Sequence, residues 1–321
     1  MLAAYANTIS SDDPVSGLVV GIRPDPQPRD GWTTVTVKAA ALNHHDLWTL
    51  RGVGIRAEQL PMILGGDAAG IDEDGNEVVV HSVITSPGWT GDDTLDPKRS
   101  LLSEVYDGTL AEKILVPRRN LVAKPASLTF EQAACLPTAW LTAYRMLFVK
   151  ANLAPGSTVL IQGAGGGVST ASIALGKAAG LRVWVTGRSE AKREAALALG
   201  ADQVFESGAR LPDRVDAVID NVGQATWAHS LKSLRPGGAI VTCGATSGPN
   251  PASDLNRVFF LQLQVLGSTM GTRDELEQLL ALLDTTGLRP QIDSVLPLAD
   301  AEFGLKKLAT GDIQGKIVLI P

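Results

Sequence analysis

Residues 158–170, TVLIQGAGGGVST, decide the fold of this 321-residue chain. A run of β-forming residues leads straight into Gly163-Ala164-Gly165-Gly166-Gly167-Val168, and an Ala-rich helical pattern follows until Gly180. A nucleotide pyrophosphate needs a backbone free of side chains at a helix N-terminus, where N–H groups point toward it. Ser169 stands where a last glycine is usual, but serine is small enough for close packing. The segment therefore predicts a Rossmann-type unit that binds a nicotinamide cofactor.

Strands and helices alternate after this loop. The patterns predict strands at residues 182–185, 216–220, 239–242 and 264–267, and helices at 190–199 and 274–283. Such alternation is typical of a parallel, doubly wound sheet.

The first third of the chain is different, because β-formers there come in short runs between turn residues. The predicted strands are residues 19–22, 32–39, 78–80 and 113–116, and residues 85–107 form a surface loop rich in Pro, Gly, Asp and Ser. A helix opens after Thr129, and a last strand is predicted at 316–320. The fold class is therefore α/β, with a central Rossmann sheet and a second, mostly β domain.

The end of the second Rossmann strand favours NADP(H) over NAD(H). An NAD site places Asp or Glu there to hold the ribose hydroxyls, but Gly187 stands at this position. A carboxylate would repel a 2′-phosphate by about 4 kcal/mol at 4 Å and an effective dielectric of 20. Arg188, Ser189 and Lys192 offer hydrogen-bond donors instead. The alternative is that Arg188 and Lys192 are ordinary exposed side chains.

Composition argues against several other classes of protein. The chain has 28 basic and 34 acidic side chains, a net charge of −6 and no basic run. It therefore lacks the positive charge that would attract nucleic acid or an anionic membrane. Residues 1–7 lack the pattern of a signal peptide, and no apolar stretch is long enough to span a bilayer. Cys135 and Cys243 are far apart and give no disulfide framework. We expect a cytoplasmic protein with a small-molecule substrate.

The whole chain also resembles the medium-chain dehydrogenase/reductase superfamily. The resemblance rests on segments in the right order: residues 41–46 (ALNHHD), Arg51-Gly52, 64–70 (LGGDAAG), 107–112 (DGTLAE), Leu136-Pro137, 142–144, the glycine loop, 200–202 and 315–319 (GKIVL). It implies a GroES-like catalytic domain, formed by residues 1–125 and 266–321, around a Rossmann domain at 126–265.

Zinc members of this superfamily bind their catalytic metal through a Cys, a His with a neighbouring Glu, and a second Cys. By motif, those places hold Asn43, Gly66 with Asp67, and Thr138. A catalytic zinc needs three Cys, His or carboxylate ligands and an open position. A different site built from residues 44–46 would require adjacent side chains of a strand or loop to converge, which is uncommon. The resemblance therefore points to the zinc-lacking, quinone oxidoreductase-like branch.

Without zinc, the leading hypothesis is NADPH-dependent hydride transfer to an electron-poor acceptor such as a quinone or an α,β-unsaturated carbonyl. One alternative is a zinc-free NADP-dependent alcohol dehydrogenase or carbonyl reductase. Another is an NADPH-binding sensor with little turnover. The last gains weight because Trp48 stands where many zinc-free relatives carry a proton-donating tyrosine.

His45 occupies the place of the hydroxyl residue that relays protons in zinc members, so it is a candidate acid. Asp46 is expected to orient His45 or its loop rather than to react. Structural roles for His44 and His45 are the alternative. Trp89 and Tyr106 either line the substrate pocket or pack in the core.

The patterns and the resemblance together predict a set of cofactor contacts. These residues are Asn43, Thr138, Thr142, Gly163, Gly165, Gly166, Gly167, Val168, Gly187, Arg188, Ser189, Lys192, Asn221, Val222, Cys243, Gly244 and Lys316. Cys243 is expected to be a buried small hydrophobe rather than a nucleophile. An apolar strand at 259–267 is expected to pair across a two-fold axis in a homodimer, with a monomer that covers this edge as the alternative.

Overall fold

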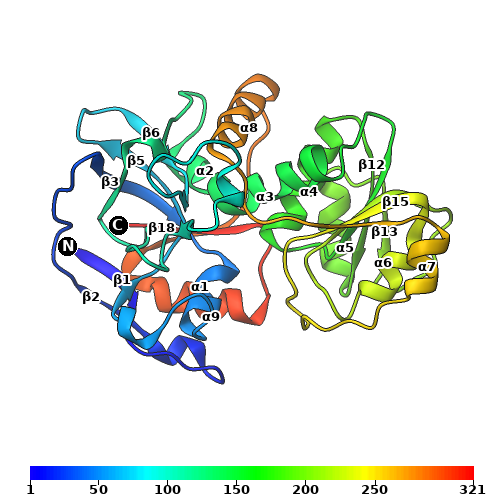
Figure 1. Ribbon diagram of the computed structural model, residues 1–321, viewed down its shortest axis with the longest axis horizontal. Helices are drawn as coiled ribbons and strands as arrows, with labels where there is room; N and C mark the ends of the chain where they lie inside the picture. Colours follow the sequence, from blue (N-terminus) through cyan, green and yellow to red (C-terminus); the bar gives the residue numbers. More distant parts are fainter. The chain divides into compact units, whose positions relative to one another are not determined.

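A computed structural model describes all residues 1–321, which form two compact units (Figure 1). One unit contains Met1–Leu141 and Gly271–Pro321, and the other contains Thr142–Met270. The predicted domain boundaries, after residues 125 and 265, both fall too early. The first unit continues past residue 125 because α2 (Phe130–Ala134) packs against its strands β3 (Trp32–Ala41) and β5 (Asp67–Asp72).

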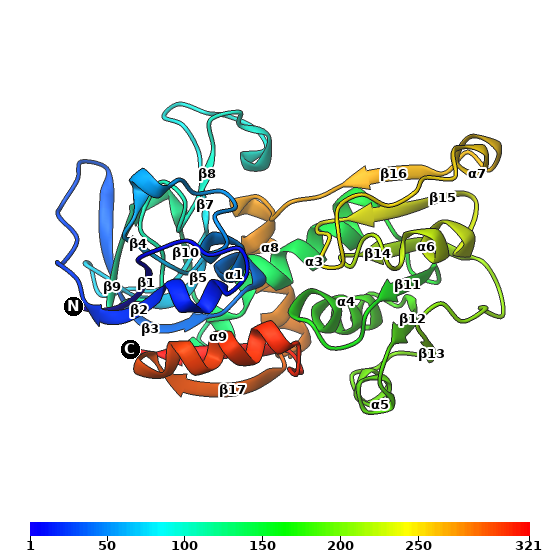
Figure 2. The same cartoon turned by 90° about the horizontal axis from the view of Figure 1, so that it is seen from below.

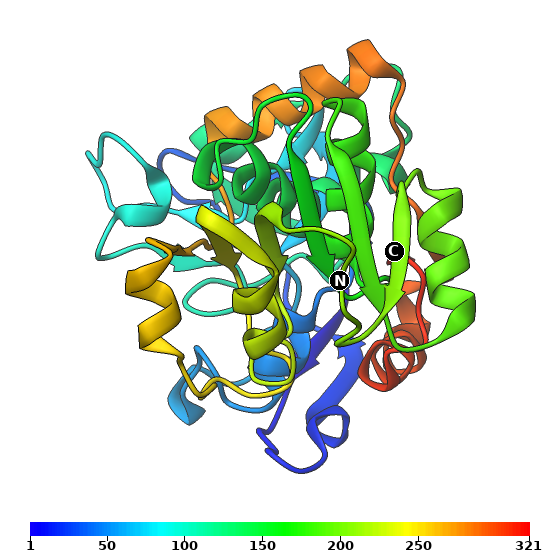
Figure 3. The ribbon, with the colours of Figure 1, turned by 90° about the vertical axis from the view of Figure 1, so that its right-hand side faces the viewer.

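The central unit, Thr142–Met270, contains the predicted doubly wound sheet. Its six strands are all parallel, in the order β13-β12-β11-β14-β15-β16 (Figure 3). Their bounds are β11 Thr158–Gln162, β12 Arg182–Gly187, β13 Gln203–Glu206, β14 Val215–Asp220, β15 Leu234–Thr242 and β16 Gln264–Gly267. The order steps outward from β11 in both directions, which confirms the α/β fold class.

Helices connect these strands. The predicted helix after the glycine loop is α4 (Gly167–Ala178), which packs on β11 and β12, and α5 (Glu190–Ala198) packs on β12 and β13. On the other half of the sheet, α6 (Trp227–Ser233) packs on β14 and β15. Crossovers between parallel strands are right-handed almost without exception, so connections that step in opposite directions from β11 put their helices on opposite faces of the sheet.

The strand predicted at residues 259–267 is only partly correct. Phe259 and Phe260 end helix α7 (Leu255–Phe260), and the strand begins at Gln264. The Asp254 side chain accepts a hydrogen bond from the Arg257 backbone N–H, which caps a helix at this point. Local capping therefore overrides the β propensity of the two phenylalanines.

The other unit, built from the two ends of the chain, contains the mostly β domain. Its seven-stranded sheet has the order β10-β6-β5-β3-β18-β17, and β9 also pairs with β3. The bounds are β6 Glu77–Val80, β9 Lys113–Pro117, β10 Leu121–Ala123, β17 Ile292–Pro297 and β18 Lys316–Ile320. Two smaller sheets contain β1 (Leu2–Ala6), β2 (Leu18–Ile22) and β4 (Met62–Ile63), and β7 (Val83–Ile84) with β8 (Ser100–Leu101).

Four helices complete this unit: α1 (His44–Leu50), α2, α8 (Arg273–Thr286) and α9 (Ala301–Thr310). Helix α1 packs against α9, which runs alongside β17 (Figure 2). The expectation that residues 44–46 lie in a strand or loop is wrong, because the Asn43–Asp46 capping box starts a helix there. No helix of the chain combines the length and apolar character needed to cross a membrane.

Short helical turns make the remaining connections. The 3-10 turns are Pro14–Gly17, Ala57–Gln59, Asp93–Leu95, Arg118–Asn120 and Leu298–Asp300. The two units meet in the sequence within helix α3 (Leu141–Tyr144), which has a π-helical turn on each side, Leu136–Trp140 and Arg145–Lys150.

Strand β3 fixes the position of the predicted catalytic residues. At its end, Ala41 pairs with Asp67 of β5 on one side and with Val318 of β18 on the other. The chain then turns at Leu42, whose N–H donates to the Ile317 carbonyl, and α1 begins. The end of β3 and the first halves of β5 and β18, which lie far apart in the sequence, are therefore neighbours in the sheet.

Candidate active site

A buried ammonium group lies at the centre of this region. The Lys316 Nζ donates to Asn43 Oδ1 at 2.5 Å, to the Leu42 carbonyl at 2.8 Å and to Asp67 Oδ2 at 3.0 Å. Asn43 in turn donates its side-chain N–H to Asp67 Oδ2 at 2.8 Å. The side chains of Lys316 and Asp67 are 3% and 0% exposed, so this is a fully buried ion pair. All three ammonium hydrogens have acceptors within the unit.

The four places at which zinc relatives hold ligands do come together in the fold. Asn43 and Asp67 are hydrogen-bonded, and a Cβ added at Gly66 would lie 3.4 Å from Thr138 Oγ1. Their donor set does not fit zinc, however. Gly66 has no side chain, Thr138 is a poor ligand, and the oxygens of Asn43 and Asp67 bind an internal ammonium group instead. This arrangement also leaves Lys316 no donor for a cofactor, which differs from the contact that the resemblance implied.

The imidazole of His45 lies between two residues of the loop at 85–107. Its Nε2 is 3.3 Å from Glu104 Oε1, and its Nδ1 is 3.4 Å from Ser103 Oγ. Burial lowers the pKa of His45, but Glu104 and the nearby carboxylates of Asp46 and Asp67 outweigh that effect and raise it. The side chain is 25% exposed, so it is accessible from solvent. Sequence reasoning found His45 but missed both of its partners.

Asp46 has a different role from His45. It is fully buried, and its Oδ2 accepts the Asn43 backbone N–H at 2.8 Å as part of the capping box of α1. Burial raises the pKa of Asp46 to about 6. The carboxylate therefore holds the start of α1 and lies near enough to His45 to raise the pKa of its imidazole.

Two aromatic residues singled out from the sequence make packing contacts. Trp48, on α1, is stacked by the Arg51 guanidinium at 5.0 Å from the ring centroid. Tyr106 packs against Trp32, with ring centroids 4.9 Å apart. His44, next to His45 on α1, is exposed.

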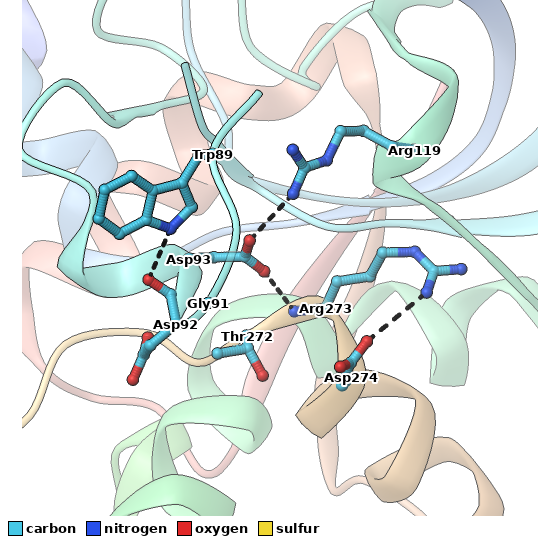
Figure 4. Close-up of a pocket in the computed structure, with 8 residues that line it drawn as sticks. All are labelled: Trp89, Gly91, Asp92, Asp93, Arg119, Thr272, Arg273 and Asp274. Atoms are coloured by element: carbon cyan, nitrogen blue, oxygen red, sulfur yellow. Dashed lines mark hydrogen bonds and ion pairs between the residues drawn. The ribbon is translucent and has the colours of Figure 1, made fainter. Parts of the chain in front are cut away.

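Trp89 lines a cavity of about 340 Å³ in the same unit (Figure 4). The Asp93 carboxylate also lines it, and accepts from Arg119 Nη2 at 3.1 Å and from the Arg273 backbone N–H at 2.9 Å. The Trp89 indole N–H donates to the Asp92 carbonyl. No residue predicted to be catalytic or to bind the cofactor lines this cavity, so it is separate from the candidate site.

In the central unit, the glycine loop has the geometry that a phosphate requires. Gly163 has a φ of +88°, which favours glycine, and Gly166 is the N-cap of α4 with open space around its Cβ position. No side chain caps α4, so its first N–H groups remain available to an anion. Ser169 fits the helix as a buried residue, and close helix–strand contact is made at Gly176 instead, where a Cβ would lie 3.0 Å from Val183.

A side chain at residue 187, at the end of β12, would be tightly packed. A Cβ at Gly187 would lie 3.0 Å from the Arg193 Cγ and 3.1 Å from the Ala164 Cβ of the glycine loop. Arg188 follows and is exposed, while Ser189 caps α5 by accepting from the Lys192 N–H. Arg193, which the sequence analysis missed, donates to the Gly187 carbonyl at 2.9 Å.

The loop at residues 221–223 is held by the buried carboxylate of Asp220. This group accepts the backbone N–H groups of Val222 and Gly223 and the hydroxyls of Thr226 and Ser230. Ser230 also accepts from Gln162 at the end of β11, and Gln162 accepts from Thr186 on β12. A buried polar network thus fixes the ends of three adjacent strands, where doubly wound folds bind their ligands.

Cys243 directly follows β15 (Leu234–Thr242) and is partly exposed rather than buried. Desolvation of the thiol, with a smaller contribution from the Asp220 carboxylate, raises the pKa of Cys243 to about 12. The thiol therefore stays protonated, which agrees with the expectation that it is not a nucleophile. Gly244 beside it is exposed, and Thr142 of α3 is buried.

Comparison with known proteins agrees with this architecture. Residues 29–126 match the alcohol dehydrogenase GroES-like domain, and residues 167–285 match the zinc-binding dehydrogenase family. An acryloyl-coenzyme A reductase of Metallosphaera sedula is 32% identical over 316 residues, which cover 92% of this chain and 94% of that protein.

Solved structures give the same result. The structure of an NAD-dependent alcohol dehydrogenase is 34% identical, with a TM-score of 0.91 and full coverage of both chains. A 2-octenoyl-CoA carboxylase reductase, solved with NADP and 2-octenoyl-CoA, is 25% identical with a TM-score of 0.91, over 99% of this chain and 87% of that one.

The chain therefore belongs to the medium-chain dehydrogenase/reductase superfamily. It is an oxidoreductase that uses a nicotinamide cofactor and acts on small molecules.

The buried cluster makes a first prediction. Lys316→Met should lower the free energy of unfolding by about 3–5 kcal/mol, because it leaves the buried Asp67 carboxylate without its cation. Lys306→Met is the matched control, since Lys306 forms an exposed pair with Glu302 and should change stability by less than about 1 kcal/mol. Chemical denaturation followed by circular dichroism measures both. Equal effects of the two substitutions would contradict a special role for Lys316.

Proposed function

We propose that this protein is a zinc-independent, NADPH-dependent reductase of carbon–carbon double bonds conjugated to a carbonyl, with quinones as further acceptors. The observation that carries the proposal is the Lys316–Asn43–Asp67 cluster. Oxygens at the ligand positions of zinc relatives bind an ammonium group, so this chain lacks a ligand set for a Lewis-acidic metal. Conjugated acceptors are already electron-poor and need less polarisation than an ordinary alcohol or aldehyde.

The bound nicotinamide would supply the hydride. The glycine loop and the N-terminus of α4 would hold its pyrophosphate, and the Asp220-supported loop at 221–223 would lie along the ribose. His45 would donate the proton that completes the reduction, because its raised pKa keeps the imidazole protonated to higher pH than an ordinary histidine. The acryloyl-coenzyme A reductase and the 2-octenoyl-CoA carboxylase reductase among the similar proteins support an acceptor of this class.

The proposal predicts a particular order of activities. With NADPH, the purified protein should reduce enoyl thioesters, simple enones and quinones, and should act much more slowly on aldehydes. Loss of reduced-nicotinamide absorbance measures each rate, and elemental analysis measures zinc. Alcohol oxidation as the main activity, which the similar alcohol dehydrogenase structure would favour, or one tightly bound zinc per chain would overturn the proposal.

The preference for NADPH is assigned to Arg188. Arg188→Ser should raise the KM for NADPH by about 10- to 100-fold, because a charge-assisted hydrogen bond to phosphate contributes about 1.5–3 kcal/mol. The KM for NADH should change little. Arg182→Ser, at the opposite end of the same strand, is the matched control. Faster turnover of the wild type with NADH than with NADPH would contradict this assignment.

We also propose that the protein is a homodimer through β16. This strand is at the edge of its sheet. Its own Val265 and three residues of the preceding helix α7 are 48–79% exposed: Leu255, Phe259 and Phe260. A second copy could extend the sheet and cover these side chains.

Light scattering tests the dimer. The wild type should have twice the mass of the 33.7 kDa chain, and the double substitution of Phe259 and Phe260 by Asp should reduce it to that of a monomer. Phe303→Asp, at a 60% exposed position on α9, should leave the dimer intact. A monomeric wild type would rule the proposal out.

A further inference from the structure

The partner of His45 comes from a segment in which the sequence shows no motif. Glu104 follows β8 in the loop at 85–107, and its Oε1 lies 3.3 Å from the His45 Nε2. The preceding residue, Ser103, is fully buried with a φ of +68°, and its hydroxyl lies 3.4 Å from the Nδ1 of the same ring. The side chains of two consecutive residues, Ser103 and Glu104, thus contact the two nitrogens of the imidazole.

The Glu104 carboxylate is fixed from several directions. Its Oε2 accepts the Leu101 backbone N–H at 3.0 Å. The backbone carbonyl of Glu104 accepts a hydrogen bond from the side-chain amide of Gln59. Gly54, with a φ of +80°, passes so close that a Cβ there would lie 3.0 Å from Oε1. Glycine adopts this positive φ without strain, and its lack of a side chain leaves room for the Glu104 carboxylate. Glu104 is therefore placed against His45 rather than meeting it by chance.

The pair is shielded but still open to solvent. The side chains of His45 and Glu104 are 25% and 23% exposed. An ion pair in this setting is screened less than one on the surface, so the carboxylate acts more strongly on the imidazole.

Other charges face His45 from the elements that pack around it. Asp46 on α1 and Asp67 on β5 add negative charge. The Lys316 ammonium on β18 forms an ion pair with Asp67. Glu104 is the one of these carboxylates that reaches the ring through a hydrogen bond. Removing its charge should therefore affect the imidazole more than removing any other.

We propose that Glu104 is a positioning residue which, together with Ser103, holds the His45 imidazolium as the proton donor of the reduction. This inference rests on the proposed function and names a residue that the function did not require. In the imidazolium, the Nε2–H donates to Glu104 and the Nδ1–H faces Ser103 at the longer distance of 3.4 Å, so we assign the more weakly held Nδ1 proton to the transfer.

A bound reduced nicotinamide would supply a hydride to the β-carbon of the acceptor and would itself be oxidised. The π electrons of the double bond move to the α-carbon side, and this carbon takes the Nδ1 proton of His45. The double bond is lost, one C–H bond forms at each carbon, and His45 is left neutral. It regains a proton from solvent, to which both members of the pair are open.

The test combines histidine NMR with pH–rate profiles. Glu104→Gln keeps the shape of the side chain but removes its charge, and Glu58→Gln makes the same change at an exposed position nearby in the fold. His45→Asn assigns the His45 resonance among the four histidines of the chain. Glu104→Asp retains the charge but withdraws it from the ring, and serves as a second variant should Glu104→Gln fold poorly.

The expected result is that His45 titrates at lower pH in Glu104→Gln and is unchanged in Glu58→Gln. Because the donor must be protonated, the loss of kcat on the alkaline side should then begin at lower pH. At alkaline pH, where His45 of the variant has lost its proton, the kcat of Glu104→Gln should be roughly tenfold lower than that of the wild type. At lower pH, where both are protonated, the two kcat values should be similar. Glu104→Asp should give a smaller shift in the same direction.

Two results would overturn the inference: an unchanged His45 titration in Glu104→Gln, or a loss of kcat that is equal at every pH. These outcomes are distinct from failure of the proposed function. A wild type that reduces none of the conjugated acceptors refutes the function, while the NMR titration still decides whether Glu104 holds His45 protonated.

Discussion

One buried ammonium group organises the unit formed by the two ends of the chain. Lys316 brings together the end of β3, the start of β5 and the start of β18, and each contact it makes involves a group that would be costly to bury alone. The geometry of this cluster sets where α1 begins, because Asn43 is both its N-cap and a Lys316 partner. The position of His45 follows from that start. The placement of the partly exposed His45, the proposed proton donor, thus depends on a charge that solvent does not reach.

Much of the fold could be predicted because its signals are local. The strand–glycine–helix run at 158–170 gave β11 and α4, and the last strand was predicted with its observed bounds, Lys316–Ile320. Thr129 was predicted to open a helix and does cap α2. Each of these signals is a turn, a cap or a periodicity that is complete within a few residues. The glycine loop and the glycine at 187 were found from the sequence for the same reason.

The rest of the site depends on contacts between distant segments. Glu104 lies 59 residues from His45, in a loop without periodicity, and no local pattern connects the two. The sequence around Arg193 is that of an ordinary helix, and only the packing of α5 against β12 brings its side chain to the Gly187 carbonyl. Phe259 and Phe260 have high β propensity, but a capping aspartate five or six residues earlier places them in a helix. For Glu104 and Arg193 the deciding contact is tertiary, whereas for the two phenylalanines a local cap outweighs β propensity.

The distance between Asp67 and Lys316 along the chain has a consequence for biosynthesis. The two residues are separated by 249 positions, and the whole central unit is translated between them. A chain emerging from the ribosome therefore carries a carboxylate destined for burial long before its counterion exists. The central unit is contiguous in sequence and can fold as soon as it emerges, whereas the unit that begins first must finish last.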